Sequence, residues 1–196
     1  HDLRLNLPDG RVLMDGINGE LVAGARVAIV GPSGTGKTTF LRAMAGIWPF
    51  GSGHIEASTA GRALFLCHRP YLPIGSLRAA VSYPSAPDAF PDDKIREALG
   101  LLELGHLALR LDETRHWEQD LSGDEQQRLI FARVLLHEPA WLFMDDATAE
   151  ISERMERHIY ELLAERMPRA AVVSITHREA VAAYHETRWM LSPGGP

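Results

Sequence analysis

The eight residues 31–38 constrain this chain more than any other stretch. They read Gly-Pro-Ser-Gly-Thr-Gly-Lys-Thr, which fits the pattern G-x-x-x-x-G-K-[ST]. Glycines let the backbone curl so that successive N–H groups face an anion, and a helix that begins there adds partial positive charge. The run follows the apolar, β-branched residues 26–30 and precedes helix-forming residues 37–45. These features predict a phosphate-binding loop between a buried strand and a helix, and therefore nucleotide binding.

The side chains of this loop have predicted roles. Lys37 should reach the β- and γ-phosphates of ATP, and the Thr38 hydroxyl should ligate Mg²⁺. The residues expected to bind the nucleotide are Gly31, Pro32, Ser33, Gly34, Thr35, Gly36, Lys37, Thr38 and Thr39.

A second candidate site follows an apolar run, residues 141–144, which ends in two carboxylates, Asp145 and Asp146. Ligands of α/β sheets bind at the carboxyl ends of parallel strands. Asp145 is therefore the expected Mg²⁺-binding acid, and Asp146 is placed to orient or deprotonate an attacking water. Taken alone, two solvated acids at the end of a strand would fit equally well, and the upstream phosphate loop favours the functional reading.

The pattern of the chain predicts an α/β fold built on a phosphate-loop NTPase core with a mainly parallel sheet. Residues 3–7 and 12–14, separated by Pro-Asp-Gly, predict an antiparallel hairpin at the N-terminus. Further buried strands are expected at 63–67, 141–144 and 171–175, and helices at 92–102, 125–136 and 152–167. The proline-rich and then helical stretch 69–138 is expected to be a helical subdomain, with residues 1–68 and 139–196 forming the core of one ATP-binding domain.

Composition narrows the class of protein. The 196 residues carry a formal net charge of −6, which argues against nucleic acid as a partner. One cysteine cannot form an intrachain disulfide, and no apolar run approaches the roughly 20 residues needed to span a bilayer. The chain opens with His1 rather than Met, so we expect a soluble piece of a longer protein.

Residues 121–128, Leu-Ser-Gly-Asp-Glu-Gln-Gln-Arg, resemble the signature sequence of ABC transporter ATPases, L-S-G-G-[QE]-x-Q-R. Ala147-Thr148 is similar to the start of that family's D-loop. His177 follows Ser-Ile-Thr as the family's switch histidine does, and residues 65–73 resemble its Q-loop region. The order and spacing agree along essentially the whole chain. Within this family, the motifs most resemble those of half-transporters of the peroxisomal fatty-acyl and bacterial ATP-binding-permease type.

The resemblance implies a mechanism and partners. Two ATP-binding domains, as a homodimer or heterodimer, would dimerise head to tail, with ATP between the phosphate loop of one and Ser122 and Gly123 of the other. ATP hydrolysis with Mg²⁺ would drive a transmembrane domain of the same or another chain, at the cytoplasmic face of a membrane. Asp146, His177 and Lys37 would be catalytic, and His68 would join Thr38 and Asp145 as a metal ligand.

Several positions depart from the family pattern, and we expect hydrolysis to be slow. Asp146 stands where the family has Glu, and a misplacement of about 1 Å can cost roughly 10²-fold in rate. Asp124 replaces the second signature Gly; at about 5 Å and an effective dielectric of about 20, its repulsion of a phosphate charge costs roughly 3 kcal/mol. His68 replaces the Q-loop Gln, Ser152 replaces the D-loop Asp, and Glu150 intrudes just before it.

One further departure concerns the nucleotide base. No aromatic residue occurs before Phe40, so the ring that usually stacks on adenine is missing. Apolar contact from Leu7, Pro8 or Val12 is the expected substitute.

Two alternatives remain beside the transporter ATPase. One is a nucleotide-dependent dimerisation switch with little or no hydrolysis, which the changes at Asp146, Asp124 and Ser152 favour. The other is an ABC-type ATPase acting on DNA or ribosomes, which the acidic balance disfavours.

Overall fold

The fold described is that of a computed structural model, and it covers residues 1–56 and 61–192. Its strands are β1 (Leu3–Asn6), β2 (Val12–Ile17), β3 (Arg26–Val30), β4 (Gly51–Ser52), β5 (Ala63–Cys67), β6 (Gly75–Ser76), β7 (Thr114–Arg115), β8 (Trp141–Asp145), β9 (Ala171–Ile175) and β10 (Thr187–Met190). Its helices are α1 (Lys37–Met44), α2 (Leu77–Ser82), α3 (Asp92–Leu101), α4 (Trp117–Asp120), α5 (Gly123–His137), α6 (Glu153–Arg166) and α7 (Glu179–Ala182), with a 3₁₀ turn at Gly105–Leu107.

Contacts gather the chain into two compact units. The core unit comprises His1–Phe65, Pro139–Asp146 and Arg169–Pro196, and the helical unit comprises Leu66–Glu138 and Ala147–Pro168. The expected division placed residues 147–168 in the core, whereas by contact they group with the helical unit.

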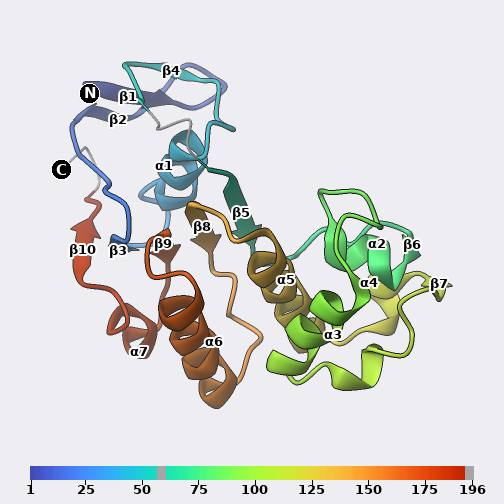
Figure 1. The fold of residues 1–196 in the computed structure, drawn as a ribbon. Helices are drawn as coiled ribbons and strands as arrows, with labels where there is room; N and C mark the ends of the chain where they lie inside the picture. The colour runs from blue at the N-terminus through green and yellow to red at the C-terminus, as the bar shows by residue number, and fades with distance from the viewer. Residues whose placement is uncertain (57–60, 193–196) are drawn as a thin grey trace. The chain divides into compact units, whose positions relative to one another are not determined.

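The main sheet of the core unit has the strand order β10-β3-β9-β8-β5. The pairs β10–β3, β3–β9 and β8–β9 are parallel, as expected for strands joined by helical crossovers (Figure 1). β9 is buried along its whole length, which explains why its five residues are apolar except for Ser174. The α/β fold with a mainly parallel sheet is therefore confirmed.

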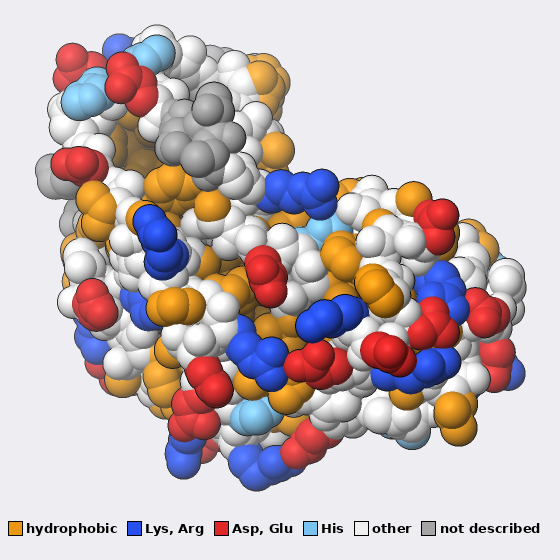
Figure 2. Space-filling view, in the orientation of Figure 1, with side chains coloured by type: hydrophobic (Ala, Val, Ile, Leu, Met, Phe, Trp, Pro, Cys, Tyr) orange, Lys and Arg blue, Asp and Glu red, His pale blue; other side chains and the backbone are white. Residues whose placement is uncertain are grey.

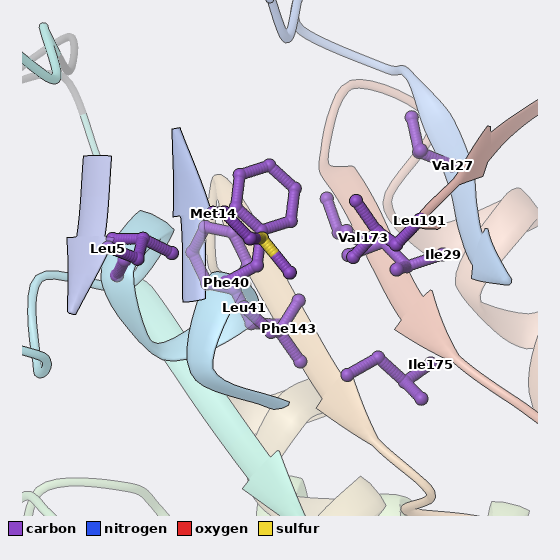
Figure 3. Close-up of a cluster of buried hydrophobic side chains, with 11 residues drawn as sticks. Leu5, Met14, Val27, Ile29, Phe40, Leu41, Phe143, Val173, Ile175 and Leu191 are labelled. Carbon is purple, nitrogen blue, oxygen red and sulfur yellow. The ribbon is translucent and has the colours of Figure 1, made fainter. Parts of the chain in front are cut away.

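The N-terminal hairpin is also confirmed. β1 pairs antiparallel with β2, and β4 adds a third strand to the other edge of β1. α1 contacts β1 as well as β8 and β9 of the main sheet, so the helix that follows the phosphate loop has apolar neighbours on two sides. Figure 3 shows the resulting core, in which side chains of the hairpin, α1 and the sheet converge. Its buried members include Leu5, Met14, Ile29, Leu41, Phe143 and Val173.

The helical unit is built mostly of helices, as predicted for its first part. α3 and α5 contact each other, and α2 packs on α5. The fully buried Trp117 donates its indole N–H to the Gly75 carbonyl at 3.0 Å, which anchors α4 to the short β6–β7 pair. Over the helical unit in Figure 2, acidic and basic side chains alternate rather than forming a field of one sign.

Four short strands of the described residues escaped the sequence analysis for a shared reason. β10, β4, β6 and β7 are two to four residues long, and none is an apolar run. β10 reads Thr-Arg-Trp-Met, and its pairing with β3 at the edge of the sheet makes it a strand. Within the part of the chain that the structure describes, no helix combines the length and apolar character that a bilayer crossing requires.

Candidate nucleotide site

The phosphate loop has a backbone that only glycine tolerates at two of its bends. Gly31 and Gly36 have φ of 147° and 90°. A Cβ on Gly31 would lie 2.3 Å from the Leu191 carbonyl oxygen, and one on Gly36 would lie 2.6 Å from Leu13 Cδ2. Gly31 therefore excludes other residues by a clash with backbone as well as by dihedral preference, whereas at Gly36 the dihedral is the main barrier because the Leu13 side chain can shift. The turn leads into α1, whose first N–H groups have no partner within the helix.

Lys37 holds this loop from inside. Its ammonium donates to the Gly31 and Pro32 carbonyls at 2.9 and 2.8 Å, and the side chain is buried. The Thr35 hydroxyl donates to the same Pro32 carbonyl at 2.9 Å. An ammonium has three donors, so the loop engages two of them and one is left to meet an anion. The tip residues Ser33 and Gly34 are exposed.

Thr38 and Asp145 lie together, although 107 residues separate them in the sequence. The Thr38 hydroxyl donates to Asp145 Oδ1 at 3.1 Å. Burial raises the pKa of the Asp145 carboxyl above its ordinary value of 3.8, and the bond from Thr38 opposes this rise only in part. A hydroxyl and a carboxylate at the start of a helix are the oxygen ligands that Mg²⁺ prefers when phosphates complete its shell. The residues present therefore fit a magnesium-bound nucleotide.

Asp146 and His177 form the second contact of this region. Asp146 Oδ2 lies 3.6 Å from His177 Nε2, and both side chains are partly exposed. The Asp146 backbone is left-handed, with φ of 49°, and its N–H donates to the Ile175 carbonyl at 3.2 Å. Few non-glycine residues adopt such a φ, and those that do often lie at functional sites. The carboxylate is thus held next to the histidine that follows β9.

Ser122 and Gly123 lie in the helical unit, at the start of α5. Ser122 caps the helix: its hydroxyl accepts from the Glu125 N–H at 3.3 Å and donates to Glu125 Oε2 at 2.9 Å. Partial burial opposes ionisation of Glu125, yet bonds from Ser122 and the nearby His106 hold the pKa of that carboxyl below its ordinary value. The signature start is therefore a complete capping box, with its hydroxyl committed to the cap.

The Asp124 carboxylate forms an ion pair with Arg128. Its Oδ2 lies 2.5 Å from Arg128 Nη2, one helical turn along α5. Arg128 in turn donates to the Leu102 and Glu103 carbonyls at 3.1 Å. These side chains line a polar cleft of about 420 Å³ together with Glu150, Ser152 and Arg154. From the sequence alone, the negative charge of Asp124 is expected to repel a phosphate. In the structure this charge is partly balanced by the guanidinium of Arg128.

His68 lies in the helical unit, on the loop after β5, with its imidazole beside Glu150. Sequence reasoning missed Gln127, which is fully buried and contacts the backbones of both residues. The available signals were its place at the second Gln of the signature pattern and a glutamine among the apolar positions of α5. The structure thus groups the predicted residues in two sets, one in each unit.

One known protein family matches most of this chain. Residues 14–149 match the family model described as ABC transporter. This match covers more than half of the chain. The chain belongs to the ABC transporter family.

Individual relatives of this chain also belong to the ABC transporter family. The chain is 39% identical over 194 residues to an uncharacterized ABC transporter ATP-binding protein of Haemophilus influenzae, covering 99% of this chain and 33% of that protein. It is 32% identical over 190 residues to human ATP-binding cassette sub-family D member 3, covering 93% of this chain and 28% of that protein. The chain therefore spans about a third of the length of these relatives.

A solved structure shows the same fold. The structure of a bacterial Atm1-family ABC exporter with ATP bound superposes with a TM-score of 0.82 at 23% sequence identity, covering 99% of this chain and 37% of that one. The chain is an ABC transporter ATP-binding domain, as the sequence resemblance implies. ABC ATP-binding domains use ATP, normally with Mg²⁺.

Proposed function

We propose that this domain binds MgATP at residues 31–38 and hydrolyses it slowly to drive transport through a membrane domain. The observation that carries the proposal is the contact between Thr38 and Asp145 at the start of α1. It joins the two elements that must act on one ion, the end of the phosphate loop and the end of β8. When bound, Mg²⁺ would neutralise charge on the phosphates, and Thr38 and Asp145 would hold it, with His68 as the third proposed ligand.

The remaining loop residues would hold the phosphates. Backbone N–H groups of residues 33–39 would donate to them, and the free donor of Lys37 would pair with the β- and γ-phosphates. The buried Lys37 stem and its two carbonyl contacts keep the ammonium at the loop rather than in solvent. Binding energy at this site would therefore come mostly from the phosphates rather than from the base.

For hydrolysis, Asp146 would accept a proton from the attacking water while His177 faces the γ-phosphate. The 3.6 Å separation between these side chains supports a joint role. A carboxylate beside an imidazole fixes the orientation of the ring. Because Asp is one methylene shorter than Glu, we expect turnover to be slow.

The second half of each site would come from another ATP-binding domain. Ser122 and Gly123 lie at the N-terminus of α5, a helix of 15 residues, and would offer its positive end to the γ-phosphate. The Ser122 hydroxyl would donate to the phosphate by turning its proton away from Glu125. Their use requires a head-to-tail dimer, either with a second copy or with a different chain.

The transmembrane domain is the other proposed partner, with this domain at the cytoplasmic face of the membrane. In the helical unit, the stretch between β5 and the end of α2 exposes Tyr71 and Ile74, and Tyr83 follows it. Their exposed fractions are 61%, 74% and 41%, respectively. Large apolar side chains on one loop are typical of a docking surface.

The second candidate function is a switch in which ATP controls dimerisation without efficient hydrolysis. The shortened acid at position 146 favours it. Single-turnover hydrolysis with Mg²⁺, in wild type and in the Asp146→Asn variant, separates the two functions. A motor requires a wild-type rate at least about 10²-fold above that of the variant. Equal background rates with intact ATP binding would leave only the switch.

A further inference from the structure

Three residues of the helical unit form a closed set of contacts around a buried amide. Gln127 Nε2 donates to the His68 carbonyl at 2.9 Å, and the Glu150 N–H donates to Gln127 Oε1 at 2.9 Å. His68 Nε2 then lies 3.6 Å from Glu150 Oε1. Gln127 is fully buried, so both of its bonds are shielded from water. One side chain therefore fixes the backbones of two loops, and the side chains of those loops meet.

The stem of Glu150 has a defined resting place. A Cβ built on Gly123 would lie 3.4 Å from Glu150 Cγ and 3.7 Å from its Cδ. The glutamate thus lies against the first residue of α5 while its carboxylate reaches His68. A Cβ at position 123 would make an ordinary van der Waals contact with this stem.

Both members of the pair differ from the family pattern described above. His68 occupies the Q-loop position where Gln is usual, and Glu150 is the residue that intrudes into the D-loop. They are far apart in the sequence, yet the fold brings a carboxylate to the ring nitrogen of the one histidine in that loop. An isolated glutamate at position 150 would add only negative charge near the signature. Paired with His68, it has a partner.

Stability does not explain this pair. The side chains are 45% and 54% exposed, and exposed pairs contribute little to folding. The pair instead affects the His68 ring, because a carboxylate near one ring nitrogen favours the tautomer with its proton on that atom. With the proton on Nε2, Nδ1 of His68 is left as an acceptor with a lone pair.

We propose that Glu150 is a positioning residue for His68. It holds the imidazole as the Nε2–H tautomer, so that Nδ1 can serve where the family uses the oxygen of a glutamine. The proposal rests on the proposed function in one respect, namely that His68 acts on the metal-bound nucleotide. The pairing itself is a property of the nucleotide-free chain and can be tested without ATP.

The first experiment records ring ¹H–¹⁵N correlations of His68 in the nucleotide-free chain at about pH 8, where imidazoles are mostly neutral. The His68→Gln variant assigns the signal. We expect the Nε2–H tautomer to dominate in wild type and in Glu150→Gln, which keeps an acceptor. Glu150→Ala should shift the ring nitrogens toward a mixture of tautomers, whereas Glu165→Ala, which removes an exposed acid on α6, should not. Identical spectra in wild type and Glu150→Ala would overturn the proposal.

The second experiment is a double-mutant cycle in single-turnover hydrolysis. Glu150→Ala should slow the reaction by about 10-fold in the His68 background, in the range seen when the partner of a ligating histidine is removed. In the His68→Gln background the same change should have little effect, so that the double variant, which carries the Gln usual in the family at position 68, turns over faster than Glu150→Ala alone. Equal effects in both backgrounds would contradict positioning. Failure of the proposed function would appear separately, as a wild type that does not bind ATP or turn it over.

Discussion

The two halves of the candidate site are built in different ways. In the core unit, residues 31–38 match the pattern throughout, and the fit is made by backbone: glycine dihedrals, carbonyls around Lys37, and the first turn of α1. In the helical unit, the departures at positions 68, 124 and 150 are side chains, and each meets an oppositely charged or hydrogen-bonding neighbour. Main-chain geometry tolerates little change at Gly31 and Gly36 of the phosphate loop. Side-chain contacts tolerate change where a partner changes or is available nearby.

The comparison teaches how substitutions in a motif should be judged. Asp124 read alone opposes a phosphate, but Arg128 lies 2.5 Å from its carboxylate and is itself held by two carbonyls. His68 read alone is a lost glutamine, but Glu150 lies beside it. Asp146 in the core unit differs, because its neighbour His177 matches the family pattern and does not extend the reach of the shorter acid. We therefore locate the expected loss of rate at Asp146 rather than at the signature.

The largest expected effect comes from Lys37→Ala in the core unit. Removing the ammonium deletes a charge-assisted bond to phosphate and the two bonds that hold the loop. ATP affinity in a nucleotide titration should fall at least about 100-fold, near the upper range for bonds to charged groups. The chain has one other lysine, Lys94, so Lys94→Ala is a matched control and should bind ATP as wild type does. An unchanged affinity in Lys37→Ala would show that residues 31–38 are not the site.

Asp145→Asn should have two opposed consequences. Mg²⁺ should raise the ATP affinity of the wild type, and loss of the carboxylate should reduce this gain in affinity by at least about 10-fold. The nucleotide-free variant should unfold less readily than wild type near pH 7, because the folded-state pKa of Asp145 is raised by burial and its ionisation opposes folding.

The sign of this stability effect can be checked by pH. The wild-type stability that depends on protonated Asp145 is complete below the ordinary value of 3.8 and is lost as pH rises through the raised folded-state pKa. Urea unfolding should therefore show the gap between variant and wild type growing as pH increases. Asp88→Asn, an exposed change, should show no such gap. A gap independent of pH would mean that the carboxylate charge is not its source.

Substitutions of Ser122 sharpen the contrast in the helical unit. Ser122→Ala removes the cap of α5 and should lower the free energy of unfolding by about 1 kcal/mol, whereas Ser122→Gly should cost only a few tenths. Both lack the hydroxyl. If that hydroxyl serves the partner's nucleotide, ATP-dependent dimerisation measured by sedimentation should weaken equally in the two variants. Weakening only in Ser122→Ala would indicate a purely structural role.

The smallest effect is expected for Asp124→Gly. Because Arg128 partly balances the carboxylate, turnover and ATP-dependent dimerisation should rise by only a few-fold, well below what the roughly 3 kcal/mol of unscreened repulsion implies. Phosphate release by Asp124→Gly and by the double variant Asp124→Gly/Arg128→Met measures this balance. A rise of 100-fold in the single variant would show that Arg128 does not offset the charge and would erase the contrast between the two units.

Much of the fold follows from local pattern. The expected strands 26–30, 63–67 and 171–175 agree with β3, β5 and β9, because short apolar runs between turns have few other ways to be buried. α5 begins at Gly123, two residues earlier than expected, because Ser122 caps the helix directly before that residue. β10 was missed because its residues are mostly exposed and only pairing with β3 defines it.

By itself, the sequence determined the phosphate loop, its strand and helix, and the family, since these depend on residue types at fixed local spacing and on backbone preferences. The tertiary structure alone decided that Thr38 meets Asp145 and that His68 faces Glu150, whereas the pairing of Asp124 with Arg128 follows from their spacing of four residues on α5. The reason is physical: a backbone bend is encoded by the residues that make it, whereas a contact between side chains depends on where the fold brings distant segments and which rotamers remain open to them.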